Sequence, residues 1–322
     1  MQTLLILTAV LLTSDGTTKR AFIGSCALGA AVLVKITSVL ALPALLILPN
    51  YGKTVGSSKS KIAAAIVLPV LTGLSIYAFY NYVRFGNLFA TGYNISGAAG
   101  EVTGNRIGNP LTGLFGLLFS TGRGLIWYAP PVLAGLIGCA GFFHEKKRMA
   151  IALALLAASW IVLHSCFQAW DSGWGWGPRY LLPILPFILV PAAEAWKRRI
   201  GKVFCVALAI VGFLIQIPGA LIDFMASGRA GMTLFGQSSQ DHSATAFVAW
   251  RNFQIAGSEI VRHFALLKQG EIDLAWQTFS DSPLPKVTLM LAAILAVSGS
   301  ALLFSAWSLN RRQSQNLGRA TP

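Results

Sequence analysis

The residues best suited to chemistry stand in one short segment, QAWDSGWGWGPRY, at positions 168–180. It combines three tryptophans and three glycines with Asp171 and Arg179. Glycine lets a backbone approach a ligand closely, and flat aromatic faces suit sugar rings as well as the lipid interface. The guanidinium of Arg179 presents a fork of donors that matches phosphate oxygens. An aromatic belt with an arginine beside a membrane helix would use the same residues, and the segment alone does not separate the two interpretations.

Two further segments of the same character each contribute an arginine. Arg84 lies in NYVRFGNLFATGY at 81–93, and Arg123 lies in LFSTGRGLIWYAP at 118–130. One arginine at a helix end is usually an anchor. Three of them with glycines and aromatics, joined by Lys35 if it shares their surface, indicate a site for a phosphorylated ligand at the edge of a bilayer.

The elements that must position these residues are membrane helices. The chain has 322 residues, of which 55% are hydrophobic and 11% charged, whereas soluble domains carry about 25% charged residues. Its apolar residues form blocks near the roughly 20 residues that a bilayer span requires, and helix satisfies the backbone inside lipid. The fold class expected is therefore an all-α, polytopic transmembrane helical bundle, built from the blocks 1–13, 21–49, 62–82, 124–143, 151–163, 181–193, 203–220 and 287–307.

The charges predict how these blocks cross. The formal net charge is +14, but the basic residues cluster in short gaps, and cytoplasmic loops carry the excess Lys and Arg of membrane proteins. The gaps at 19–20, 50–61, 146–148, 197–202 and 311–319 are therefore assigned inside, which makes the charge a topology signal and argues against nucleic acid as a partner. Alternation then gives about nine membrane segments. The block 21–49 is either a hairpin with its turn near Lys35 at the outer face, or one tilted span with the 13–20 gap outside.

This topology divides the chain into three parts. Residues 1–220 form the transmembrane region with outer loops 83–123 and 168–180, residues 221–286 an extracytoplasmic segment, and residues 287–322 the last helix with a basic cytoplasmic tail. Prolines 183, 186 and 191 predict a broken helix. Within 221–286, apolar residues at helical spacing predict an amphipathic helix lying on the membrane or on the protein; they are Ile260, Val261, Phe264 and Leu267.

Neither the four cysteines nor the four histidines show metal-ligand or redox spacing. Lys35, His164 and Gln216 are nearly all of the polar groups inside the apolar blocks, and no paired halves appear. Both features argue against a transporter.

Four phrases in this sequence also resemble, in order, the second half of C-type polytopic glycosyltransferases. They are GAAVLVKITSVLALPALLILP, RFGNLFATGY, LLFSTGRGLIWYAPP and GWGWGPRYLLPILPF, which together cover roughly residues 20–195. The GPRY phrase with its trailing prolines is the most specific. The resemblance is to the bacterial protein O-mannosyltransferase-like and lipid A aminoarabinose transferase-like enzymes.

The resemblance implies transfer of a sugar from a polyprenyl-phosphate carrier, with inversion, to an extracytoplasmic lipid, glycan or protein acceptor. A carboxylate base would activate the acceptor, and basic residues, with or without a divalent metal, would hold the leaving phosphate. Carried onto this chain, Arg179 and Lys35 are the expected phosphate contacts and Arg84 and Arg123 weaker ones. Tyr180, Trp176 and Asp171 would shape the site.

One departure concerns the catalytic acid, which the family places in the first outer loop, well upstream of the lysine-containing helix. Here the sole acid before Lys35 is Asp15, on the predicted inner side. The chain is therefore expected to be an N-terminally truncated transferase, and no catalytic base is assigned. Glu101 and Asp171 are acids on the outer side that could act as the base, although Asp171 could instead orient Arg179.

The expected function is thus a multi-pass glycosyltransferase of a bacterial inner membrane. The alternative is a non-catalytic membrane protein that binds or translocates a lipid-linked glycan.

Overall fold

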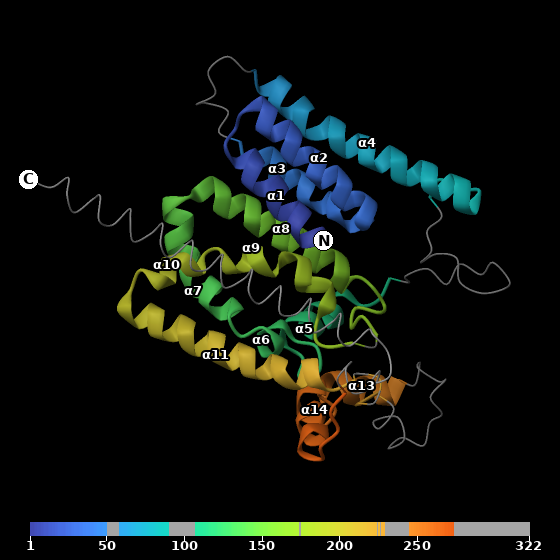
Figure 1. Ribbon diagram of the computed structural model, residues 1–322, viewed down its shortest axis with the longest axis vertical. Coiled ribbons are helices and arrows are strands. Elements are labelled where there is room, and N and C mark those ends of the chain that lie inside the picture. The colour runs from blue at the N-terminus through green and yellow to red at the C-terminus, as the bar shows by residue number, and fades with distance from the viewer. Residues whose placement is uncertain are drawn as a thin grey trace, which may run out of the picture.

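The computed structural model describes residues 1–49, 58–89, 107–173, 175–223, 225, 227–228 and 245–273 (Figure 1). Every regular element within these ranges is helical, and an isolated bridge pairs Ile107 with Phe167. The expected all-α class is confirmed for this part of the chain. The predicted last membrane segment at 287–307, Glu101 and Trp174 lie outside the described residues.

The helices follow the apolar blocks of the sequence, with several blocks divided. In chain order they are α1 (Gln2–Ser14), α2 (Thr18–Val34), η1 (Ile36–Ala41), α3 (Leu42–Ile47), α4 (Lys59–Phe85), α5 (Pro110–Phe119), α6 (Leu125–Tyr128), α7 (Val132–Glu145), α8 (Lys147–Ser165), η2 (Arg179–Ile184), α9 (Leu185–Leu189), α10 (Ala192–Trp196), α11 (Arg199–Leu221), α13 (Thr245–Phe253) and α14 (Glu259–Lys268).

Three of these helices are long and apolar enough to cross a membrane: α4, α8 and α11. At 1.5 Å per residue the shortest of them, α8, is about 28 Å long, close to the thickness of a bilayer core. Their outward faces are apolar, as at Ile210 and Phe213 of α11, which are 55% and 70% exposed. These features mark the chain as a membrane protein. The remaining apolar helices are shorter than a full span, so the structure does not establish the count of about nine crossings.

The block 21–49 turns at Lys35, as the hairpin interpretation expects. Helix α2 ends at Val34, where Lys35 adopts an extended backbone, and η1 and α3 follow. The Ser38 hydroxyl donates to the carbonyl of Ala31 and closes this turn. From Lys35 to Pro49 the chain runs along α8, from its C-terminal end to its N-terminal end. Lys35 lies over the ring of Tyr180, which packs on His164 in the last turn of α8. Arg148, in the first turn of α8, donates to the carbonyl of Pro49.

Helix α7 packs lengthwise against α9 and α10 through glycines. Gly135 faces the carbonyl of Ile188, and Gly138 faces the carbonyl of Pro191, with no room for a side chain at either position. Positions 135 and 138 of α7 meet positions 188 and 191 in the same order, so the two segments run parallel. The proline-rich block is broken into η2, α9 and α10, which confirms the predicted interruption.

The two ends of this bundle differ in chemistry. At the basic end, defined here by Pro49, Glu145, Arg148 and Lys197, the Lys197 ammonium lies 2.6 Å from carboxylate oxygens of both Glu145 and Glu194. The aromatic end is defined by Lys35, His164, Trp176 and Tyr180. Helices α4 and α11 run in the same sense on opposite sides of the bundle, and α13 and α14 cover the C-terminal end of α11 (Figure 1).

Helix α14 confirms the predicted helix near 260–267 but turns a different face inward. Its buried residues are Glu259 and His263, whereas Val261 and Phe264 are exposed. The reason is an internal polar network that receives the Glu259 carboxylate.

Candidate anion site at the aromatic end

Lys35 and Arg179 come together at the aromatic end, although 144 positions separate them in the sequence (179 − 35). The Lys35 ammonium lies 5.1 Å from the ring centroid of Tyr180, the residue after Arg179. The side chain of Arg179 passes over Gly175, where a Cβ would lie in van der Waals contact with it, at 3.5 Å. Partial burial of the Lys35 ammonium lowers its pKa below the ordinary value, and the nearby positive charge of Arg179 lowers it further.

The ring of Tyr180 is held by three neighbours. Trp160 donates its indole N–H to the Tyr180 carbonyl at 2.8 Å. The His164 ring lies 4.9 Å from the Tyr180 ring, centroid to centroid, and Phe167 meets it edge-on at 6.3 Å. Trp160 and His164 come from the last turns of α8, and Phe167 follows that helix, so the end of α8 holds the ring against which Lys35 lies. In the sequence, Trp160 lies within an apolar block and His164 directly follows it, and neither carries a signal for this contact.

The charges of the two cations are unbalanced. Among the described residues, neither Lys35 nor Arg179 forms an ion pair with a carboxylate. Two neighbouring like charges repel, more strongly where water is partly excluded. An anion placed between them would relieve that repulsion, and a phosphate group fits the donors present.

An apolar groove of about 320 Å³ opens along the segment that contains Arg179, although neither Lys35 nor Arg179 lines it. Its walls come from α6 and α7, from the 176–189 stretch and from α11. Trp176, Gln216 and Tyr128 line it and are linked to one another. The Trp176 indole N–H donates to Gln216 at 2.9 Å, and the Gln216 amide donates to the Tyr128 carbonyl at 2.6 Å. Trp176 and Pro178 line the groove immediately before Arg179, so one segment contributes to both features.

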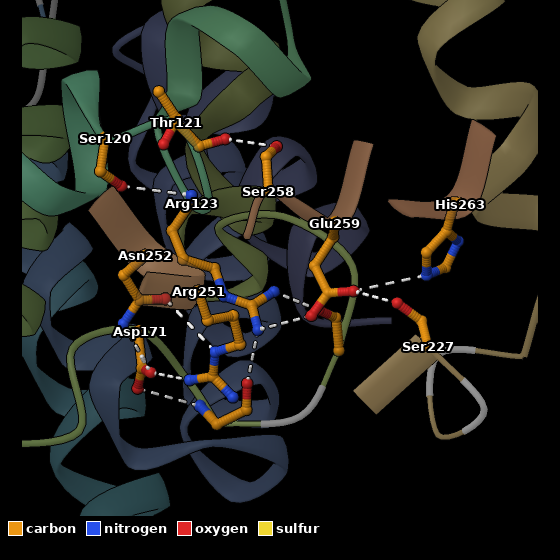
Figure 2. Close-up of polar contacts among 12 residues, drawn as sticks. Ser120, Thr121, Arg123, Asp171, Ser227, Arg251, Asn252, Ser258, Glu259 and His263 are labelled. Carbon is orange, nitrogen blue, oxygen red and sulfur yellow. Dashed lines mark hydrogen bonds and ion pairs between the residues drawn. The ribbon is translucent and has the colours of Figure 1, made fainter. Parts of the chain in front are cut away.

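Arg123 has a different environment from Lys35 and Arg179. Its side chain is fully buried and donates to the carbonyls of Gly173 and Gly175, and a guanidinium nitrogen lies 3.8 Å from Glu259 (Figure 2). The backbone between these carbonyls is bent by positive φ angles of 65° at Gly173 and 152° at Gly175. Arg123 therefore positions the segment that carries Arg179.

Asp171 pairs with Arg251 rather than with Arg179. The carboxylate accepts from Arg251 and, at 3.1 Å, from Asn252, while its second oxygen accepts from the Gly173 backbone at 3.1 Å (Figure 2). Asp171 is 8% exposed. Its partners lie 80 residues away on α13, a distance over which the sequence pattern carried no signal.

Glu259 joins α14 to this cluster. Its carboxylate accepts from Ser227 at 2.8 Å and lies 3.5 Å from the His263 imidazole, whose other nitrogen faces the Pro218 carbonyl of α11. Burial acts to raise the pKa of Glu259, but His263 and the charges of Arg123 and Arg262 outweigh it and bring the pKa to about 2. We call Arg123, Asp171, Arg251, Asn252 and Glu259 the closed cluster.

Arg84 lies at the end of α4, where its guanidinium contacts Tyr80 and Phe85 of the same helix. The structure thus brings together Lys35, Arg179 and Tyr180 at the anion site, places Trp176 in the groove, buries Arg123 and Asp171, and leaves Arg84 on an exposed helix end.

Within the described part of the chain, no three His, Cys, Asp or Glu side chains are grouped so that they could hold a metal ion. Comparisons of the chain with protein-family models, with curated proteins and with solved structures find no match.

Proposed function

We propose that this chain binds a polyprenyl-phosphate-linked sugar at Lys35 and Arg179 and serves its transfer to an extracytoplasmic acceptor, in the manner of a C-type glycosyltransferase. The observation that carries the proposal is a pair of cations that has no carboxylate partner among the described residues, one of them, Arg179, in a segment that also lines an apolar groove. A phosphate on an isoprenoid chain has the same two parts, an anionic head and an apolar tail.

The energetics favour a phosphate over a neutral head. Hydrogen bonds to charged groups contribute about 1.5–3 kcal/mol each. A phosphate would also relieve the repulsion by Arg179 that, after burial, lowers the pKa of Lys35. Tyr180 and Trp176 offer flat faces for the sugar ring. The groove that Trp176 lines is otherwise walled by apolar side chains such as Leu182, Leu185 and Phe213, which suit the first isoprene units.

The membrane arrangement that supports this function is multi-pass, with about nine crossings. The basic end would face the cytoplasm of a bacterial inner membrane, because Arg148 and Lys197 lie there. The anion site would then lie at the outer surface, where a lipid-linked sugar meets its acceptor.

In the transfer step, an acceptor oxygen or nitrogen attacks the anomeric carbon of the sugar. The bond between that carbon and the phosphate oxygen breaks, and the oxygen keeps the electron pair. Lys35 and Arg179 would stabilise the departing phosphate. A base must take the acceptor proton, and the two carboxylates of the closed cluster are held by Arg251, Asn252, Ser227 and His263. We therefore assign the phosphate contacts and no base.

The test uses the full chain in proteoliposomes with a radiolabelled polyprenyl-phosphate sugar. Arg179→Ala should weaken binding of the lipid by roughly 10- to 100-fold, the equivalent of one charged hydrogen-bonding contact. Arg198→Ala, an exposed arginine at the basic end, is the matched control and should bind as the parent does. Unchanged binding by Arg179→Ala would overturn the site.

A second candidate is a protein that binds or moves the lipid-linked glycan without transferring the sugar. It is favoured by the engagement of both carboxylates of the closed cluster, Asp171 and Glu259, with other side chains, which leaves the base unassigned among the described residues. Binding that depends on Arg179, with no label reaching any lipid, glycan or protein acceptor, would select this alternative. Label released from the carrier and recovered on an acceptor would select the transferase.

A further inference from the structure

Helix α5 carries an uncharged apolar stripe on its exposed side. Leu111, Phe115 and Phe119 follow one another at a spacing of four residues and are 76%, 55% and 50% exposed. The sequence from 107 to 122 contains no charged residue. In water such a stripe would be an association-prone patch. Two aromatic neighbours extend it: Phe253 stacks on Phe115 at 6.3 Å, and Trp127 is about half exposed.

The opposite side of α5 fixes its place in the fold. Gly113 packs on the carbonyl of Ser165, the last residue of α8, and Gly116 packs on the ring of Trp170. Helix α8 has the length of a bilayer core. Contact with its final residue therefore puts α5 at the level where that core ends.

Both ends of α5 contact segments beyond the membrane helices. Before its first turn, Gly108 donates to the carbonyl of Cys166, just after α8. After its last turn, Gly122 donates to the carbonyl of Asn252 on α13. Ten residues span only about 15 Å, half of a bilayer core. The helix thus lies across the aromatic end instead of continuing along the bundle.

The polar groups at the ends of α5 are satisfied from within the protein. Pro110 has no N–H, and the Asn109 side chain accepts from the backbones of Leu111 and Thr112 at 2.9 and 3.3 Å. At the other end, Ser120 donates to the Gly116 carbonyl at 2.7 Å, and the Trp127 indole donates to the Phe119 carbonyl at 2.9 Å. With these groups satisfied, both ends of α5 are compatible with a lipid environment, where water cannot serve as the partner.

We propose that α5 is an interfacial helix that lies flat in the leaflet at the aromatic end, with Leu111, Phe115 and Phe119 inserted among the lipid acyl chains. The occupant of its exposed face is the same bilayer that α4, α8 and α11 cross. Continuity supports this choice, since Val162 of α8, one turn before Ser165, is exposed as well. Trp127 occupies the position typical of an interfacial tryptophan.

The depth of single nitroxide labels tests the proposal. In the full chain with its four cysteines replaced, one cysteine is introduced at Leu111, Phe115 or Phe119, labelled, and reconstituted into phosphatidylethanolamine–phosphatidylglycerol vesicles. Power saturation compares accessibility to oxygen with accessibility to a water-soluble nickel complex. Ile210, exposed midway along α11, is the deep reference, and Gln269, exposed after α14, is the aqueous reference.

All three α5 labels should lie between the two references and at one common depth. Leu111 and Phe119 are about 12 Å apart along the helix axis, so a helix standing upright would give depths that differ by about that distance. Such a difference, or labels as accessible to nickel as Gln269, would overturn the proposal. Labels inaccessible to both reagents would also overturn it, because a second copy or another segment of the chain would then cover the stripe. None of these outcomes depends on sugar binding.

Discussion

Two groups of cations lie at the aromatic end of the molecule, and they differ in what neutralises them. In the closed cluster, Arg123 and Arg251 are buried beside Glu259 and Asp171. At the anion site, Lys35 and Arg179 are close to each other and form no ion pair with a carboxylate among the described residues. The same residue types thus hold the fold in one place and are available to a ligand in the other.

The segment from Asp171 to Tyr180 connects the two groups. Its first half is bound by the closed cluster through Asp171, Gly173 and Gly175, and its second half presents Trp176 and Arg179. The difference between the groups therefore predicts opposite responses to removing charge. Loss of a charge from the closed cluster should cost stability, and loss of one from the anion site should cost binding.

The largest effect is expected from Asp171→Ala, which leaves Arg251 buried without its carboxylate. Breaking a buried pair costs about 3–5 kcal/mol, so the apparent Tm in detergent should fall by many degrees and α13 should become sensitive to protease. Glu145→Ala provides the matched control, because it also removes a carboxylate from an ion pair, but an exposed one. A Tm for Asp171→Ala as high as that of Glu145→Ala would remove the distinction between the two kinds of pair.

Acid should weaken the closed cluster next. The pKa of Glu259 is about 2 in the fold, below the ordinary value of 4.5. For a depressed pKa, the stabilisation is fully present above 4.5 and is lost as the pH falls toward 2. The difference corresponds to about 3 kcal/mol. The protection factors of the α14 amides should therefore be steady from pH 8 to 5 and fall below 4.5, and Glu259→Gln should abolish that step. A step that persists in the variant would assign it to another group.

At the anion site, removing a charge should have the opposite effect on stability. Arg179→Gln and Lys35→Met each remove one of two repelling charges, so Tm should stay the same or rise by a few degrees. Affinity for a polyprenyl phosphate should fall by roughly 10- to 100-fold. Thermal unfolding with and without the lipid measures both quantities on one sample. A fall in Tm comparable to that of Asp171→Ala would show that the pair is structural.

The sequence predicted the parts of this picture that depend on local pattern. The helical class, the turn at Lys35, the broken proline-rich block and the helix near 260 follow from apolar length, charge and proline positions. The meeting of Lys35 with Arg179 and Tyr180 was expected from resemblance to a family, not from spacing. The structure places Lys35 near Tyr180 and Arg179, and the role of Lys35 and Arg179 as phosphate contacts stays a prediction.

The closed cluster could not be predicted, for a physical reason. Arg123, Asp171 and Glu259 come from three distant segments, and an arginine before a membrane helix looks the same whether it pairs with a distant carboxylate or binds a ligand. Arg123 was accordingly grouped with the phosphate contacts. Only the tertiary placement of α13 and α14 reveals that Arg251 and Glu259 complete the network (Figure 2).

The smallest expected effect tests whether the closed cluster positions the anion site. Gly175 has a φ of 152°, and a Cβ there would lie 3.5 Å from the Arg179 side chain. Gly173 also has a positive φ, of 65°, but open space surrounds its Cβ position. Alanine at either position should cost about 1–2 kcal/mol of stability through backbone strain.

Only Gly175→Ala should also weaken binding of a polyprenyl phosphate, by several-fold, because the strain is relieved by moving the backbone against which Arg179 rests. Titration of both variants with the same lipid, at a temperature where each is folded, separates the two effects. Equal affinities would mean that Arg179 adjusts independently of the segment that Arg123 holds. A loss confined to Gly175→Ala would show that the backbone at position 175, to which Arg123 is hydrogen-bonded, sets the position of Arg179.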